Sequence, residues 1–126
     1  MYSDKRCAQE SPKEMAKVII TSALEEKINK VFRGESVEVL KLLLTLEENP
    51  KKGKEIGSVG GVIIKEIRYK NCRFYFITDG FKVKFLQNDE LQELIIKCVN
   101  MSNKKNQQTI IDKIKDGLRK IGFDGF

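Results

Sequence analysis

The chain has 126 residues, of which 33% are charged and 40% are hydrophobic, and this composition is typical of one globular domain rather than a disordered chain. Its formal net charge of +6 favours a polyanionic partner such as nucleic acid. The chain contains no histidine, so mechanisms that need an imidazole base or a histidine ligand are excluded.

Cysteine usage and short motifs narrow the possibilities further. The three cysteines have no CxxC spacing, so we expect free thiols in a reducing cytoplasm rather than disulfides or a zinc site. No GxxxxGK[ST], GxGxxG or GxSxG motif occurs, and we expect neither a metal nor a small-molecule cofactor. No stretch has the length of a membrane span and the N-terminus lacks the apolar core of a signal peptide, so we expect a cytoplasmic protein without membrane contact.

The first elements follow a polar segment. Residues 1–14 are aperiodic and are predicted to form a mobile arm ahead of a single domain at residues 15–126. Residues 16–21 (AKVIIT) predict a strand, because they are rich in β-branched side chains.

Two helices are predicted next, joined closely enough to form a helical hairpin. Ser22 and Glu25 predict a capping box at the start of the first helix, and Gly34 suits its end. Ser36 is predicted to cap the second helix, which would extend to about Glu48. The glycine-rich stretch KKGKEIGSVGG that follows matches no phosphate-binding spacing, and we interpret it as a flexible connector.

Three strands are predicted between residues 62 and 86, with two-residue turns at Lys70-Asn71 and Asp79-Gly80. These turns fix the register of the strands. The resulting pairs are Arg68–Arg73, Ile67–Phe74, Glu66–Tyr75, Phe76–Val83, Tyr75–Lys84 and Ile77–Lys82.

Because strand side chains alternate between faces, this register separates the residues by chemistry. One face is apolar and contains Ile67, Tyr69, Cys72, Phe74, Phe76, Phe81, Val83 and Phe85. The other face is largely charged and contains Glu66, Arg68, Arg73, Tyr75, Lys82 and Lys84, with Ile64, Ile77 and Leu86.

The C-terminal part completes the predicted sheet and adds a helix. Residues 94–101 (LIIKCVNM) suit either a helix or a buried strand, and we predict a turn at 87–92 followed by a fourth strand. A last helix is predicted to end at Gly122. Its apolar face consists of Ile110, Ile111, Ile114, Leu118 and Ile121.

The charged face has two interpretations. As a positive platform, it would hold phosphates by charge and a base by stacking on Tyr75. As an ordinary solvated face, it would have Glu66 offsetting the opposed arginines. Lys104 and Lys105, just before the last helix, either extend the platform or belong to a plain helix-entry loop.

The chain resembles the RelE/ParE toxin superfamily of bacterial and archaeal toxin–antitoxin systems in the order of its elements over residues 16–121. Three stretches carry the resemblance: LEENPKKG, the paired arginines of IIKEIRYKNCRFYFITDGFKVKF, and the ending NMSNKKNQQTIIDKIK. The ending is most similar to archaeal members. The resemblance implies an α+β fold with an antiparallel sheet of about four strands. An N-terminal helical hairpin would cover one face, an open basic groove would occupy the other, and a C-terminal helix would complete the domain.

The resemblance also implies a function. Nuclease members are metal-independent endoribonucleases (mRNA interferases) that cleave mRNA on the ribosome and so inhibit translation, and an antitoxin protein neutralises them. The expected partners are therefore a cognate antitoxin, the ribosome and mRNA. The catalytic residues would be Arg68, Arg73, Lys104 and Lys105. RNA binding is assigned to Tyr75, Lys82 and Lys84 of the charged face and to Lys70 in the adjoining turn. In the family, the aromatic at the position of Tyr75 is mainly structural.

Two departures from the nuclease pattern favour an alternative. Glu66 occupies a groove-facing position where nuclease members often carry lysine, and no Tyr or His lies near the start of the last helix. The alternative is a ParE-like gyrase poison or a non-catalytic module that binds nucleic acid or protein.

Overall fold

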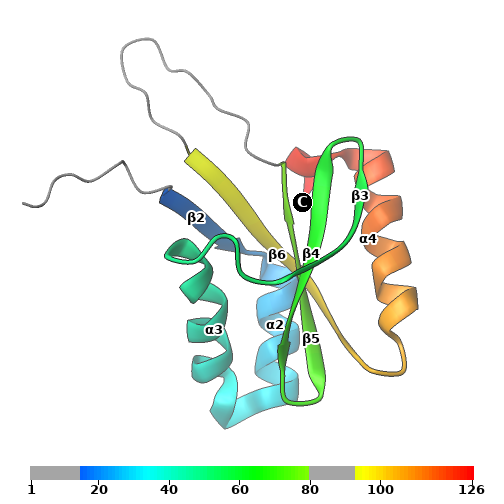
Figure 1. The fold of residues 1–126 in the computed structure, drawn as a ribbon. Coiled ribbons are helices and arrows are strands. Elements are labelled where there is room, and N and C mark those ends of the chain that lie inside the picture. The colour runs from blue at the N-terminus through cyan, green and yellow to red at the C-terminus, as the bar shows by residue number, and fades with distance from the viewer. Residues whose placement is uncertain (1–14, 80–92) are drawn as a thin grey trace, which may run out of the picture.

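The computed structural model describes residues 15–79 and 93–126. This part of the chain is an α+β unit, in which a twisted five-stranded sheet lies between helices (Figure 1). The predicted arm at 1–14, the predicted strand at 81–86 and the predicted turn at 87–92 lie outside the described residues.

The sheet is mixed rather than antiparallel. Its strand order is β2 (Met15–Ile20), β6 (Glu93–Asn103), β5 (Cys72–Thr78), β4 (Val62–Tyr69) and β3 (Lys54–Val59). β2 pairs in parallel with β6, and every other neighbouring pair is antiparallel. The expectation of about four antiparallel strands is therefore wrong in both number and direction, whereas the choice of a strand over a helix for 94–101 is confirmed.

The extra strand comes from the stretch interpreted as a flexible connector. Gly60 and Gly61 have φ values of 56° and 86°, and they form a two-residue turn that pairs Val59 with Val62. Left-handed backbone at both central positions matches the right-handed twist of the flanking strands, and glycine adopts it without steric cost. Gly-Gly here is a hairpin signal, which the prediction missed.

The β4–β5 hairpin has the predicted register. Arg68 lies opposite Arg73, and the two pairs beside them, Ile67–Phe74 and Glu66–Tyr75, are also as expected. Of the two turn residues, Lys70 takes the positive φ, at 54°, rather than the asparagine that follows it.

The predicted partners on the other edge of β5 are wrong. In place of Val83, Lys84 and Lys82, the strand pairs with β6. The observed partners are Cys98 for Phe76, Asn100 for Tyr75 and Lys97 for Ile77.

The N-terminal helices pack against each other and then against the sheet. In α2 (Ser22–Phe32) the N-cap is Thr21, one residue before the predicted capping box, and its Oγ1 accepts a hydrogen bond from the Leu24 amide at 3.3 Å. A 3₁₀ turn leads into α3 (Ser36–Leu44), where Ser36 does not cap and instead donates to the Arg33 carbonyl.

The last helix, α4 (Gln107–Ile121), ends at Gly122, which has a φ of 70° as the C-cap. Four of the five predicted apolar positions are buried, but Ile121 is 56% exposed. Across the described ranges, no helix combines the length and apolarity that a membrane crossing requires.

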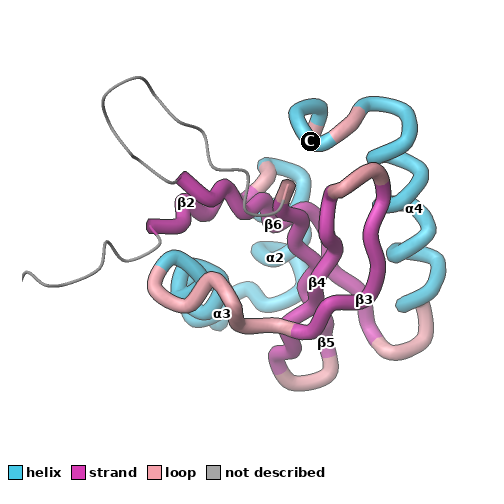
Figure 2. Tube along the Cα trace, turned by 45° about the horizontal axis from the view of Figure 1, so that its top comes forward, coloured by secondary structure: helices cyan, strands magenta, loops and turns pink. Residues whose placement is uncertain are grey.

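The helices cover both faces of the sheet (Figure 2). On one face, Ile67, Phe74 and Phe76 pack against α2 and α3. On the other face, α4 packs over the end of the sheet that includes Tyr75 and Ile77. The expectation of an open groove along this second face is therefore wrong for the part on which α4 packs.

Gly53, just before β3, lies in close contact with the core residue Phe76. Its φ is 104°, and an added Cβ would lie 2.7 Å from Cζ of Phe76 and 3.1 Å from the carbonyl oxygen of Glu66. We expect Gly53→Ala to lower the free energy of unfolding by about 1–3 kcal/mol, measured by urea denaturation, because a clash and a strained φ add together. Gly34→Ala is the matched control, since no heavy atom lies within 4 Å of its Cβ position. Equal stability of the two variants would contradict the expectation.

Candidate nucleic-acid interface

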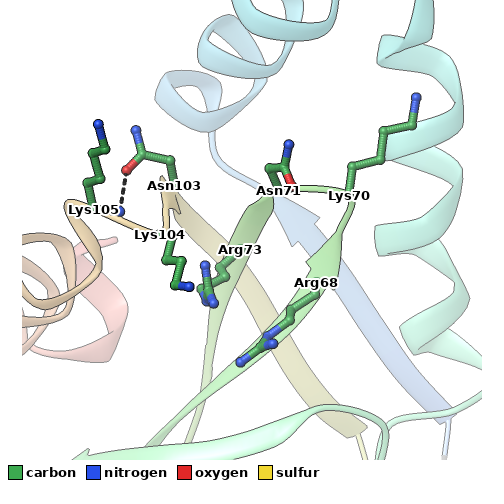
Figure 3. A pocket seen from close by; sticks show the side chains of 7 residues that line it. All are labelled: Arg68, Lys70, Asn71, Arg73, Asn103, Lys104 and Lys105. Carbon is green, nitrogen blue, oxygen red and sulfur yellow. Dashed lines mark hydrogen bonds between the residues drawn. The ribbon is translucent and has the colours of Figure 1, made fainter.

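A recess opens at the end of the sheet where the β4–β5 turn meets the loop between β6 and α4 (Figure 3). Its volume is about 540 Å³. Five of its seven lining residues are cationic, none is acidic, and the other two are asparagines. This basic recess is lined by Arg68, Lys70, Asn71, Arg73, Asn103, Lys104 and Lys105.

Sheet register explains why distant segments meet here. Arg68 and Arg73 are direct partners in the β4–β5 hairpin, and Arg73 pairs on its other side with Ser102 of β6. The loop that carries Lys104 and Lys105 begins at the end of β6 and therefore lies beside Arg73. All four residues expected to act together line a single recess.

Arg73 has the most constrained environment of the cations. The residue is only 9% exposed, and its Nε atom is buried without a hydrogen-bond partner. Within residues 15–79 and 93–126, no carboxylate forms an ion pair with it. A buried, uncompensated guanidinium is costly to the fold, so an anionic ligand that reaches it gains a preformed donor set.

Arg68 differs because its charge already has a partner. Its side chain is 60% exposed, and its Nε lies 3.5 Å from Oε2 of Glu66. Glu66 is only 4% exposed, and its Oε1 is buried without a hydrogen bond. Glu66 therefore offsets one of the two opposed arginines through an ion pair, and leaves Arg73 without one.

Lys70 is held at the rim by an acidic neighbour. Its Nζ donates to Oε1 of Glu35, and the Tyr69 hydroxyl donates to the same oxygen at 3.1 Å. These hydrogen bonds, with that from Lys70 the larger, lower the pKa of Glu35, and the bond to Glu35 raises the pKa of Lys70. An ion pair is thus maintained across the neutral pH range, and Lys70 is the least available of the recess cations.

The loop after β6 is organised by two asparagines. Oδ1 of Asn103 accepts hydrogen bonds from the amides of Lys105, at 2.8 Å, and Asn106, at 3.0 Å. Oδ1 of Asn106 in turn accepts from the Asn103 amide at 2.9 Å. The loop holds its two lysines in opposite orientations, with Lys104 extending toward Arg73 and Lys105 pointing away (Figure 3).

Tyr75 is not available for base stacking, which corrects its assignment as an RNA-binding residue. It is fully buried beneath α4, and its hydroxyl is hydrogen-bonded to Oγ of Ser102 at 2.8 Å. Burial is the main cause of its raised pKa. Of the other three residues assigned to RNA binding, Lys70 lines the recess, and Lys82 and Lys84 lie outside the described residues.

The Tyr75–Ser102 pair makes a testable contribution to stability. We expect Tyr75→Phe to lower the free energy of unfolding by about 1–2 kcal/mol, because it leaves the buried Ser102 hydroxyl without its partner. The double variant Tyr75→Phe/Ser102→Ala should recover part of this loss in the same chemical denaturation. Equal losses of stability in the single and the double variant would contradict this coupling between Tyr75 and Ser102.

Two residues of the recess, Asn71 and Asn103, were not assigned a role from the sequence. Glu66, which was expected to offset both arginines, pairs with Arg68. The Asn103-x-x-Asn106 spacing is a usable signal for the loop, because asparagine side chains bond nearby backbone amides. Nothing local in the sequence indicates the burial of Glu66.

Chemically, the cationic lining of the basic recess suits an anion. The part of the chain that the structure describes has no cluster of three or more His, Cys, Asp or Glu residues that could hold a metal ion. Comparison of the chain with protein-family models, curated protein sequences and solved structures gave no match.

Proposed function

We propose that the protein is a RelE-like toxin of a toxin–antitoxin pair, which acts in the cytoplasm and inhibits translation by cleaving ribosome-bound mRNA at the basic recess. The observation that carries the proposal is Arg73, a nearly buried guanidinium without an acidic partner in the described chain, at a recess lined by four further cations. The cost of holding such a group in the fold is offset when it binds a phosphate.

The lining of the recess supports recognition of the RNA backbone rather than of bases. No lining residue is aromatic, and the side chains present are those that bind phosphate oxygens by charge and hydrogen bonding. We therefore expect affinity to depend strongly on salt and weakly on sequence, with a slope of log K against log[salt] that grows by about 0.7 for each phosphate neutralised.

The proposed reaction needs no metal. The 2′-oxygen of one nucleotide attacks its 3′-phosphate, the bond from phosphorus to the 5′-oxygen breaks, and a 2′,3′-cyclic phosphate and a 5′-hydroxyl result. Arg73 stabilises the charge that develops on the phosphate oxygens. With Tyr75 buried, Lys104 is the group placed to protonate the leaving 5′-oxygen, and solvent accepts the proton of the 2′-hydroxyl.

A second candidate keeps the same recess without cleavage. Glu66, next to Arg68, adds a negative charge where a nuclease would gain from a cation, and the buried Tyr75 removes an aromatic acid or base. These observations favour a ParE-like gyrase poison or a non-catalytic binding module.

Inducible expression with mapping of RNA 5′ ends separates these functions. The proposal expects growth arrest, new mRNA ends that carry 5′-hydroxyl groups, and rescue by a cognate antitoxin protein. Lys120→Ala is the control, since Lys120 pairs with Asp116 far along α4 and should leave toxicity unchanged. Intact mRNA with double-strand breaks in DNA would contradict cleavage and select the gyrase branch, and absence of toxicity would select a binding module.

A further inference from the structure

A second group of cations lies on α2 and α4, the helices that contact β6 from opposite faces of the sheet. β2 pairs with β6 only as far as Cys98, so among the described residues the last part of β6 has no strand neighbour on that edge. Both α2 and α4 contact this strand. Lys27 of α2 reaches the edge, where its Nζ donates to Oδ1 of Asn100 at 2.8 Å.

Lys113 belongs to α4, which packs on the opposite face of the sheet from α2 and contacts the same strand, and it is near enough to Lys27 for the two charges to interact. Partial burial lowers the pKa of Lys27, and the nearby charge of Lys113 lowers it further. Neither lysine forms an ion pair within the described ranges, in contrast to Lys120, which pairs with Asp116 at 3.0 Å. Two like charges are thus near each other, and the hydrogen-bond partner of Lys27 is a neutral amide.

This group continues the basic recess. Asn100, which anchors Lys27, precedes the recess residue Asn103 by three strand positions, or about 10 Å. Lys113 lies six positions into α4 from its first residue, Gln107, or about 9 Å along the helix. Lys105, in the loop that joins β6 to α4, points away from Arg73 (Figure 3).

We propose that Lys27, Lys113 and Lys105 form a second phosphate-binding subsite, which carries a single RNA strand from the basic recess around the start of α4. This inference rests on the proposed function, since it assigns further nucleotides of the same RNA. Cations without acidic partners, placed in sequence beside an anion site, bind successive phosphates of one strand. The RNA strand would run alongside β6 and α4, away from the basic recess.

The test compares RNA length. Binding of the full chain to oligonucleotides of about four and about twelve nucleotides is measured with 2′-O-methyl RNA, which lacks the free 2′-hydroxyl and is not cleaved. Lys27→Met/Lys113→Met should lower the affinity for the longer RNA by about tenfold at low salt and make that affinity less dependent on salt. The affinity for the shorter RNA should not change. Methionine keeps the aliphatic stem, and Asn100 keeps a partner because its Oδ1 also accepts from the Met101 amide.

Lys41→Met/Lys120→Met is the matched control, because it removes the same charge from exposed positions on α3 and α4. Two results would overturn the subsite without contradicting RNA binding at the basic recess. One is an equal loss of RNA affinity in both double variants, and the other is a loss of affinity for both RNA lengths in Lys27→Met/Lys113→Met. Failure of the unaltered protein to bind either RNA would overturn the proposed function itself. Thermal unfolding of each variant checks that the fold is retained.

Discussion

Replacement of Arg73 by methionine is expected to lower RNA cleavage by about 10²- to 10³-fold while leaving the free energy of unfolding equal to or above that of the unaltered protein. The loss follows from removing the one guanidinium that is both nearly buried and without an acidic partner in the described chain. The gain in stability follows because methionine fills a similar volume without burying an unpaired donor. Single-turnover cleavage and urea denaturation measure the two effects.

Arg73→Lys and Arg68→Met are the companions of this variant. Lysine keeps the charge but loses the planar fork that binds two phosphate oxygens, so it should restore only part of the activity. Arg68→Met removes the ion-pair partner of the buried Glu66 and should therefore cost stability, in contrast to Arg73→Met. Full activity of a folded Arg73→Met protein would remove the basis of the proposed function, and a strong loss of stability would show that Arg73 is a structural residue.

Truncation of Phe74 to alanine is expected to lower the free energy of unfolding by about 3–5 kcal/mol, the largest loss of any variant discussed. Phe74 is fully buried, lies opposite Ile67 in β4 and Met101 in β6, and packs 6.0 Å from the ring of Phe32. Removal of its ring leaves a cavity between the sheet and α2. Phe74 is next to Arg73 in β5, so the cavity lies under the hairpin that carries the paired arginines.

Denaturant unfolding followed by circular dichroism measures the effect of Phe74→Ala. Val37→Ala is the control, since Val37 is 59% exposed and its truncation should change stability by less than about 0.5 kcal/mol. A loss below about 1 kcal/mol for Phe74→Ala would show that the α2 side of the sheet is not the principal core.

The β4–β5 hairpin was predictable from the sequence because two independent signals agreed. The turn length set Arg68 opposite Arg73, and the same register sorted the apolar and charged side chains onto separate faces. A slip of one residue would have mixed the two sets. The placement of Lys104 and Lys105 near the arginines followed from the resemblance, and the structure brings all four onto one recess.

The errors arose where pairing depends on distant segments. Asp79-Gly80 is a strong local turn signal, but β5 pairs instead with β6, which lies further along the chain, and no local pattern determines that choice. Tyr75 is two positions after Arg73 and therefore lies on the same face of the strand, so it was predicted to be on the open surface. In the structure, α4 covers its position. Coverage of a sheet face by a helix is a tertiary property, and alternation shows only which residues share a face.

The central place of β6 has a consequence for the newly made protein. β6 joins the first described strand to the middle of the sheet, and the loop that follows it supplies two of the recess lysines. During synthesis, the sheet and the basic recess are both incomplete until this late segment is available, because β6 pairs with β2 and β5 and leads into the loop that carries Lys104 and Lys105.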